Sequence, residues 1–139
     1  VIMIATLPDS SYAGWGWGSS MINTEMVIFS ADGADSQAIT YYSKGENDPT
    51  LQETLQSCYE TSVKTKKNNF VEFTTKRPLD CNVEDSYVVQ LDSLSSLITA
   101  WSTDGPNLQY HQGNKFGFQQ NFYTNGTCSH IQGSTETNN

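Results

Sequence analysis

The chain has 139 residues, a length that suits one domain with a core large enough to stand on its own. Its hydrophobic fraction of 36% argues against disorder, and its formal net charge of −8 argues against free nucleic acid as a partner, because phosphate binding needs clustered Lys and Arg. No stretch approaches the roughly 18 apolar residues of a membrane span, and no signal peptide is recognisable.

Short alternating or continuous apolar runs, separated by Gly, Pro, Asn and Asp, indicate β-strands along almost the whole chain. Strands are predicted over residues 1–6, 12–17, 25–30, 37–42, 54–64, 70–76, 87–91, 97–101 and 116–122. Residues 49–56 suit a helical turn and a strand entry equally well. Because the chain opens directly on a strand, we expect a processed or trimmed N-terminus. Nine short strands in one domain predict an all-β sandwich or barrel.

Side-chain alternation also predicts which residues share a face of their strand. Leu97, Thr99 and Trp101 fall on one face, and three phenylalanines of the last strand, at positions 116, 118 and 122, fall together as well. The lysine-rich segment 64–69 is the clearest turn and is interpreted as a solvated hairpin tip. We expect one domain over residues 1–132 and a polar tail or linker start over 133–139.

The three cysteines, Cys58, Cys81 and Cys128, lack the close spacing of a zinc site and suggest one disulfide with one thiol left over. A Cys81–Cys128 bridge is favoured because it would tie the C-terminal segment to the sandwich, while bridges from Cys58 to either of the others stay open. Asn125 begins an Asn-Gly-Thr glycosylation sequon. Together these features favour an extracytoplasmic protein, secreted or at the cell surface.

No catalytic constellation stands out: the sequence has no G-x-S-x-G motif, no metalloprotease helix and no P-loop. Asp80, Glu84 and Asp85 form a small acidic group whose spacing fits no standard calcium loop, so a solvated turn is favoured. The chain is therefore expected not to be an enzyme on its own.

Two residues with chemistry-bearing side chains lie outside the apolar runs. Met21 sits in a polar turn, whereas Met3 and Met26 lie within apolar strands and are expected in the core. His111 lies in a loop between two predicted strands, where it could close over a pocket at one end of a sandwich; the chain's other histidine is His130. A gap-filling methionine and a surface histidine are the ordinary alternatives for this pair.

Several motifs occur in an order that resembles the DOMON domain. They are Gly-Trp-Gly-Trp-Gly at 14–18, Met21, the acidic-Met-Val-Ile-Phe strand at 25–29, and the segments 75–80, 84–87, 98–101 and 110–113. The resemblance covers about residues 1–123 and implies an immunoglobulin-like antiparallel β-sandwich. Some members of the family bind haem b, while others are thought to bind sugars or to mediate contacts.

The resemblance is strongest to haem b-binding DOMON cytochromes, which include the cytochrome domain of cellobiose dehydrogenase and plant DOMON cytochromes. It implies Met21 and His111 as axial iron ligands, with Trp15, Trp17 and Tyr110 lining the porphyrin pocket or packing in the core. The sequence has no C-x-x-C-H motif, so the haem would be non-covalent. The implied role is that of an electron-transfer or binding domain, alone or within a larger oxidoreductase, and the implied partner is a redox protein or domain. The alternative is a haem-free module that binds carbohydrate or assembles through strand edges at the cell surface.

Overall fold

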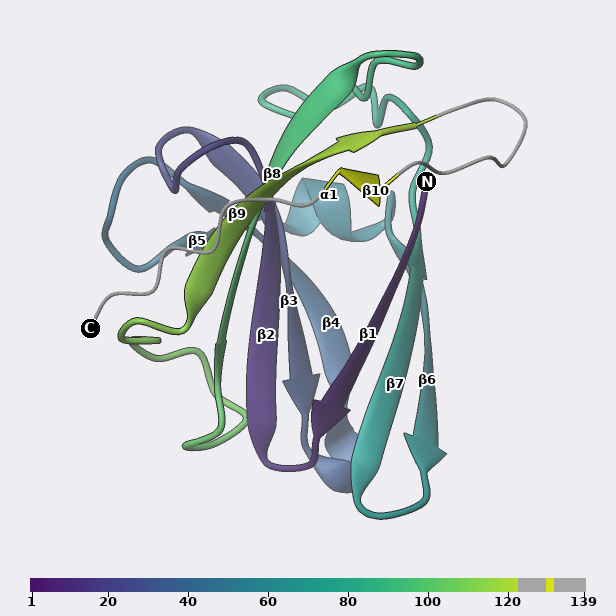
Figure 1. The fold of residues 1–139 in the computed structure, drawn as a ribbon, viewed down its shortest axis with the longest axis vertical. Coiled ribbons are helices and arrows are strands. Elements are labelled where there is room, and N and C mark those ends of the chain that lie inside the picture. Colours follow the sequence, from purple (N-terminus) through teal and green to yellow (C-terminus); the bar gives the residue numbers. More distant parts are fainter. Residues whose placement is uncertain (123–129, 132–139) are drawn as a thin grey trace.

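The computed structural model describes residues 1–122 and 130–131, which form a sandwich of two antiparallel sheets (Figure 1). The three-stranded sheet has the order β1 (Ile2–Pro8), β7 (Phe70–Lys76), β6 (Glu60–Lys66). The seven-stranded sheet has the order β10 (His130–Ile131), β9 (Lys115–Asn121), β8 (Leu94–Ser102), β2 (Ser11–Trp17), β3 (Thr24–Ala31), β4 (Gln37–Ser43), β5 (Thr50–Leu51). The prediction of an all-β sandwich is confirmed. Among the described residues, no helix is long and apolar enough to cross a membrane.

The core lies between the two sheets, where alternate residues of each strand meet. Met3, Ala5, Val71 and Phe73 point inward from the three-stranded sheet, and the Phe73 ring lies 5.3 Å from that of Phe29 on β3. The predicted alternation is confirmed in β8 and β9. Leu97 and Thr99 are buried on the inner face, and the rings of Phe116 and Phe118 contact Trp101 and Trp15.

The strand predicted over residues 54–64 is wrong in its first half. The segment contains the short helix α1 (Glu53–Gln56), which follows β5 and buries Leu55 completely, and the strand begins only at Glu60. The physical reason lies at β4. The Gln56 amide accepts a hydrogen bond from the Thr40 N–H at 2.9 Å and donates one to the Ala38 carbonyl at 2.9 Å. The Gln56 side chain thus makes hydrogen bonds to β4 that a neighbouring strand would otherwise make. A 3₁₀ turn, η1 (Gly33–Asp35), precedes β4.

The strand predicted over residues 87–91 is also wrong. Its backbone is held by loop and side-chain groups rather than by a ladder: the Tyr87 N–H donates to the Glu25 carboxylate at 2.6 Å, and the Val89 N–H donates to the Leu79 carbonyl at 2.8 Å. The apolar residues that suggested a strand are used for burial instead, since Val89 is 3% exposed.

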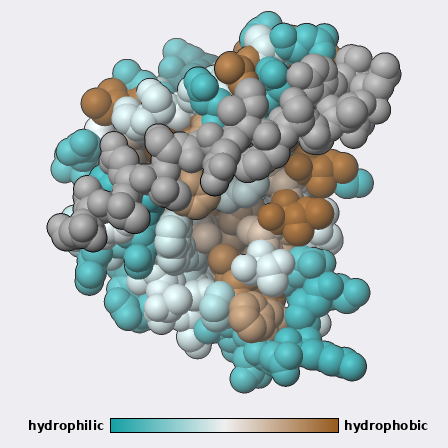
Figure 2. All heavy atoms as spheres, viewed as in Figure 1, coloured by the Kyte–Doolittle hydropathy of each residue, from teal (hydrophilic) through white to brown (hydrophobic). Residues whose placement is uncertain are grey.

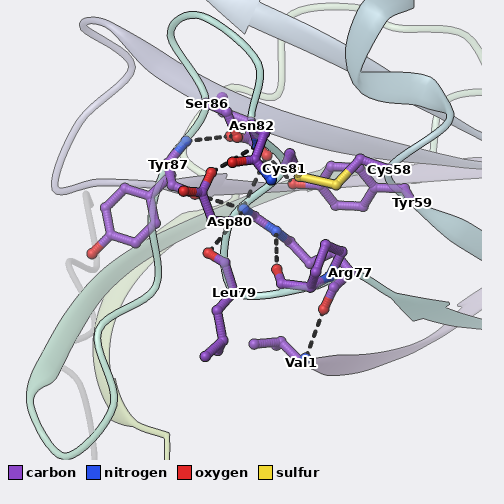
Figure 3. Close-up of a disulfide and its surroundings, with 12 residues drawn as sticks. Val1, Cys58, Tyr59, Arg77, Leu79, Asp80, Cys81, Asn82, Ser86 and Tyr87 are labelled. Carbon is purple, nitrogen blue, oxygen red and sulfur yellow. Dashed lines mark hydrogen bonds and ion pairs between the residues drawn. A yellow bond between two sulfur atoms is a disulfide. The ribbon is translucent and has the colours of Figure 1, made fainter.

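A buried ion pair explains why this loop needs no strand. Arg77 Nη1 lies 3.0 Å from Glu25 Oε1, and both side chains are fully inaccessible. The Glu25 carboxylate also accepts hydrogen bonds from the Tyr59 hydroxyl, Ser86 Oγ and the Tyr87 N–H. Arg77 donates to the Tyr87 carbonyl at 2.6 Å and stacks 5.0 Å from the Trp17 ring. Figure 3 shows Arg77 near Tyr59 and Tyr87. Such pairing offsets the cost of burying two charges.

The disulfide joins Cys58 and Cys81 (Figure 3). The favoured Cys81–Cys128 bridge is therefore wrong, and one of the open alternatives is right. Cys58 follows the short helix α1, and its Cα lies 5.8 Å from that of Cys81 in the loop that follows Arg77. Cys128, the Asn125 sequon and the predicted tail 133–139 lie outside the described residues.

Candidate functional site

The candidate site lies on the outer face of the seven-stranded sheet, away from the three-stranded sheet. It is a cavity of about 700 Å³ whose floor is the middle of β2, β3, β8 and β9. Gly14 and Gly16 alternate with Trp15 and Trp17, so this face of β2 has no side chains at the glycines. The remaining floor is apolar and is built by Met26, Ile28, Ile98, Ala100 and Gly117.

The flat floor depends on glycine. A Cβ at Gly16 would lie 2.8 Å from Thr24 Cγ2 and 2.9 Å from Ile98 Cγ1, and one at Gly14 would lie 2.7 Å from Ile28 Cδ1. All three distances are shorter than a Cβ atom tolerates, so Thr24 and the two isoleucines already fill the room beside the glycines. Gly117 differs, because a Cβ there would lie 3.6 Å from the Leu97 carbonyl oxygen, an ordinary contact.

Met21 reaches the cavity from the loop between β2 and β3. The loop turns on Gly18 and Asn23, which have φ values of 154° and 50°. The Thr24 hydroxyl closes it by donating to the Ser20 carbonyl at 2.6 Å. Met21 is half-buried and packs against the cluster of Tyr12, Met26 and Ile28. Its thioether is thus positioned on the floor rather than in the core between the sheets.

His111 reaches the same cavity from the loop between β8 and β9. Two side chains of the outer face fix this loop: the Tyr12 hydroxyl donates to the Gln109 carbonyl, and Ser30 Oγ donates to the Pro106 carbonyl at 2.8 Å. His111 is half-buried, and its Nδ1 lies 3.1 Å from the Gln112 carbonyl oxygen. A proton on Nδ1 bonded to that carbonyl leaves Nε2 with a free lone pair, as a metal-binding histidine requires.

The two loops approach the sheet from opposite ends. Tyr12 pairs with Ser102 at one end of β2, where β8 leads into the His111 loop, whereas Trp17 pairs with Leu97 at the other end, where β2 leads into the Met21 loop. Figure 1 shows the purple-blue and the green loop at these two ends of β2. We expected the His111 loop to close over a pocket at one end of the sandwich. The cavity instead lies across the outer face of a sheet, between two loops.

The three aromatic residues expected beside Met21 and His111 do not all line the cavity. Trp17 is 2% exposed on the inner face, where its Nε1 donates to the Tyr59 hydroxyl at 3.0 Å and its ring stacks on Tyr87, so Trp17 does not line the cavity. Trp15 alternates with the glycines and its ring packs on Phe118, while its backbone edges the floor. Tyr110 lines the cavity, is 80% exposed, and lies 5.6 Å from the His111 ring.

Sequence reasoning missed the residues that shape the site most directly. Tyr12 and the glycines at 14, 16 and 117 line it, and Leu108 packs against the same cluster as Met21. The sequence did contain a signal for this surface, because glycine at every second position of a strand leaves one face of the strand without side chains. Tyr12 is buried, and burial raises the pKa of its phenol. The hydroxyl therefore stays protonated and able to donate across the whole physiological range.

The charged side chains of the cavity lie at its rim. Glu46 and Asp48 come from the loop between β4 and β5, and Lys115 begins β9. Within the described residues, no group of three or more His, Cys, Asp or Glu side chains is arranged to hold a metal ion by itself. What the site offers instead is the Met21 thioether and the His111 imidazole over an apolar floor that also contains Met26, which suits an iron whose remaining ligands come with a bound macrocycle.

A second cavity, of about 710 Å³, lies between the sheets beside β1. It is lined by apolar residues that include Met3, Ala5, Trp15 and Phe116. Figure 2 shows hydrophobic residues near the N-terminal part of β1 in this region. None of the described residues that line this cavity is a histidine. It therefore offers no comparable pair of ligands.

Two solved structures share this fold. The cytochrome b domain of pyranose dehydrogenase from Coprinopsis cinerea aligns with a TM-score of 0.59 and 13% sequence identity, over 85% of this chain and 66% of that one. The cytochrome domain of Myriococcum thermophilum cellobiose dehydrogenase aligns with a TM-score of 0.54 and 12% identity, over 85% of this chain and 63% of that one. The match thus spans just under two thirds of each domain.

At these identities the comparisons establish the fold. The chain has the β-sandwich of DOMON-type cytochrome domains, and the resemblance derived from its motifs is confirmed at that level. No family model matches the sequence, and no curated protein sequence matches it either.

Proposed function

We propose that this chain is a b-type cytochrome domain that carries single electrons, with Met21 Sδ and His111 Nε2 as the two axial ligands of a non-covalent haem. One observation carries the proposal: both side chains line the same cavity, and they reach it from loops at opposite ends of the sheet. A planar group between two opposed loops has one ligand available on each side.

The chemistry of the two donors agrees with electron transfer. A thioether is a soft ligand that favours ferrous iron and raises the reduction potential, and histidine is the usual partner in such sites. When both axial positions are filled by protein, no position is open to oxygen. The residues here would therefore hold the iron, exclude water from it and leave electron exchange as the remaining activity.

The shape of the site agrees as well. Its volume of about 700 Å³ falls within the range of about 300–1,000 Å³ that is typical of ligand and cofactor pockets. The bare glycine positions leave an apolar surface against which one edge of a macrocycle can pack, and filling them would remove that surface. The hydrogen bond from Tyr12 to Gln109 fixes the loop that holds His111, so the imidazole would be in position before a haem binds.

The setting we propose is extracytoplasmic, and the partner is another redox protein or domain. The Cys58–Cys81 disulfide is typical of an oxidising compartment. The net charge of −8 would steer a partner with a basic surface and make the association sensitive to salt. The domain itself would not be an enzyme, since it would pass electrons to and from a catalytic partner.

The test is hemin titration of the purified full chain, followed by its visible spectrum. We expect one haem per chain with a low-spin spectrum in both oxidation states. Met21→Leu and His111→Ala should each lose that spectrum. Two matched controls should keep it: Met3→Leu, a methionine buried between the sheets, and His130→Ala, the other histidine. A chain that binds no hemin overturns the proposal and leaves the haem-free carbohydrate or assembly module as its rival. If the control variants lose the low-spin spectrum to the same extent, Met21 and His111 are not the axial ligands.

A further inference from the structure

We infer that Lys115 binds the carboxylate groups of the cavity's ligand, so that one end of the cavity is built for an anionic edge. The inference rests on the proposed function: the haem would lie with its propionates toward Lys115 and away from Glu46 and Asp48. The site then orients the ligand as well as ligating it.

The first support is the sign of the charges. Apart from His111, the ionisable side chains that line the cavity among the described residues are Glu46, Asp48, Lys115 and the phenols of Tyr12 and Tyr110. Lys115 is thus the one permanent cation in this lining. In a chain with 15 acidic and 7 basic residues, a lysine at the rim of this apolar floor is a specific feature of the site.

The second support is the position of Lys115 in the register. It pairs with Ala100 on β8, and its side chain falls on the same face as Gly117 and Gln119, which is the face of the cavity. Ala100 in turn pairs with Gly14 on β2, so Lys115, Ala100 and Gly14 form one row across the sheet. This row lies toward the end of the sheet where the His111 loop is anchored. The stem of the lysine can lie along this floor while its ammonium group stays at the rim.

The acidic loop lies at the diagonally opposite corner. Glu46 and Asp48 follow Ser43, which pairs with Thr24 at the far end of β3, and β4 is separated from β9 by β8, β2 and β3. Four strand spacings of about 4.8 Å and four residues of about 3.3 Å along the strand separate the backbone of Lys115 from that of Ser43 by on the order of 20 Å. The acidic loop therefore leaves the sheet at the end of β4 furthest from Lys115.

The consequence is a preferred orientation. A dianionic ligand that placed its carboxylates beside Glu46 and Asp48 would meet repulsion without a counter-charge. The same ligand turned toward Lys115 gains a charge-assisted hydrogen bond and keeps its apolar edge on the glycine floor. The neutral side chains of Gln112 and Gln119, which also line this side, are further donors.

The test compares hemin with its propionate dimethyl ester on the wild-type chain and on Lys115→Gln. We expect Lys115→Gln to weaken hemin binding about threefold to tenfold, as for a partly exposed ion pair, and to lower the reduction potential because a positive charge near the iron is removed. The ester should bind both proteins equally. Lys115→Arg should restore hemin binding. Lys64→Gln on the other sheet, with the same change in net charge, should have no effect.

The outcomes separate this inference from the proposed function. If neither hemin nor its ester binds the wild-type chain, the proposed function fails and the inference fails with it. If both bind with a low-spin spectrum but Lys115→Gln weakens them equally, or behaves like Lys64→Gln, the cytochrome proposal stands and the role of Lys115 is overturned. An independent check is Glu46→Gln with Asp48→Asn, which should strengthen hemin binding and leave ester binding unchanged.

Discussion

The hydroxyl of Tyr12 on β2 donates a hydrogen bond to the backbone carbonyl of Gln109, close to His111 in the opposite loop. The bond joins the floor of the cavity to the loop that supplies its histidine. We therefore predict that Tyr12→Phe lowers the free energy of unfolding by about 0.5–1.5 kcal/mol, the usual contribution of one hydrogen bond. It should also weaken hemin binding, because the histidine loop is no longer fixed.

The control for that variant is Tyr42→Phe, which removes a hydroxyl from β4 on the opposite face of the sheet. Urea unfolding and hemin titration measure the two quantities separately. Should Tyr12→Phe change stability but not hemin affinity, the hydrogen bond would have no part in positioning His111.

The glycines of the floor give a second prediction. Gly16→Ala should destabilise the fold by about 1–3 kcal/mol, because the new methyl group would overlap Thr24 and Ile98. Gly117→Ala should change stability by less than about 0.5 kcal/mol, since its methyl group has room. Yet both line the cavity, so Gly117→Ala should weaken hemin binding while the fold stays intact. Hemin affinity unchanged in Gly117→Ala would show that the ligand does not lie on this floor.

Much of the fold was predictable from the sequence because its strands alternate. Inward residues such as Phe73 and Leu97 follow a period of two, and turns are marked by Gly, Asn and Asp. The failures have a common cause. Residues 54–64 and 87–91 are held by side-chain hydrogen bonds from Gln56 and to Glu25, which pair distant parts of the chain. No local pattern of hydrophobicity contains that information.

The same limit applies to the site. Met21 and His111 were recognisable because each lies in a polar loop and matches a motif, and the structure brings both to one cavity. Trp17 takes the second of its two expected places, the core, and the sequence left the choice open because an aromatic motif does not say which face of a strand points to the cavity. The cavity face of β2 is the one that the three-stranded sheet does not cover. The glycines at alternate positions were the better guide to that face.

The disulfide provides a third prediction. Replacing Cys58 and Cys81 by serine should lower the free energy of unfolding by about 3–4 kcal/mol, the amount expected when a loop of 23 residues is no longer closed. Thermal unfolding with and without reductant measures it, and the serine variant should not respond to reductant. Peptide mapping of the unreduced protein should give a Cys58–Cys81 linked peptide, and a Cys81–Cys128 link would contradict the pairing.

The buried ion pair gives a fourth prediction. Arg77→Met leaves the Glu25 carboxylate buried without its counter-charge and should cost about 3–5 kcal/mol. Adding Glu25→Leu should recover part of that loss, because it removes the buried carboxylate that has lost its counter-charge. The control is Lys66→Met, whose partner Glu72 lies 3.3 Å away at a surface where the lysine is 38% exposed. That change should cost no more than about 1 kcal/mol. Urea unfolding of the wild type, Arg77→Met, Glu25→Leu, the double variant and Lys66→Met tests the set, and additive losses in the double variant would contradict it.

The pH dependence of stability follows from Tyr59, whose hydroxyl donates to Glu25 beside Arg77. Burial, followed by the charge of the Glu25 carboxylate, raises the pKa of this phenol far above its usual value. The unfolded chain loses the proton near pH 10 while the folded chain keeps it. The contribution is therefore fully present below pH 10 and is lost progressively above it. Burial also raises the pKa of Tyr12 and Tyr42, which adds in the same direction. Urea unfolding between pH 7 and 11 should show stability falling above about pH 10, with a shallower fall in Tyr59→Phe. Equal slopes in the two proteins would show that this phenol titrates normally in the folded state.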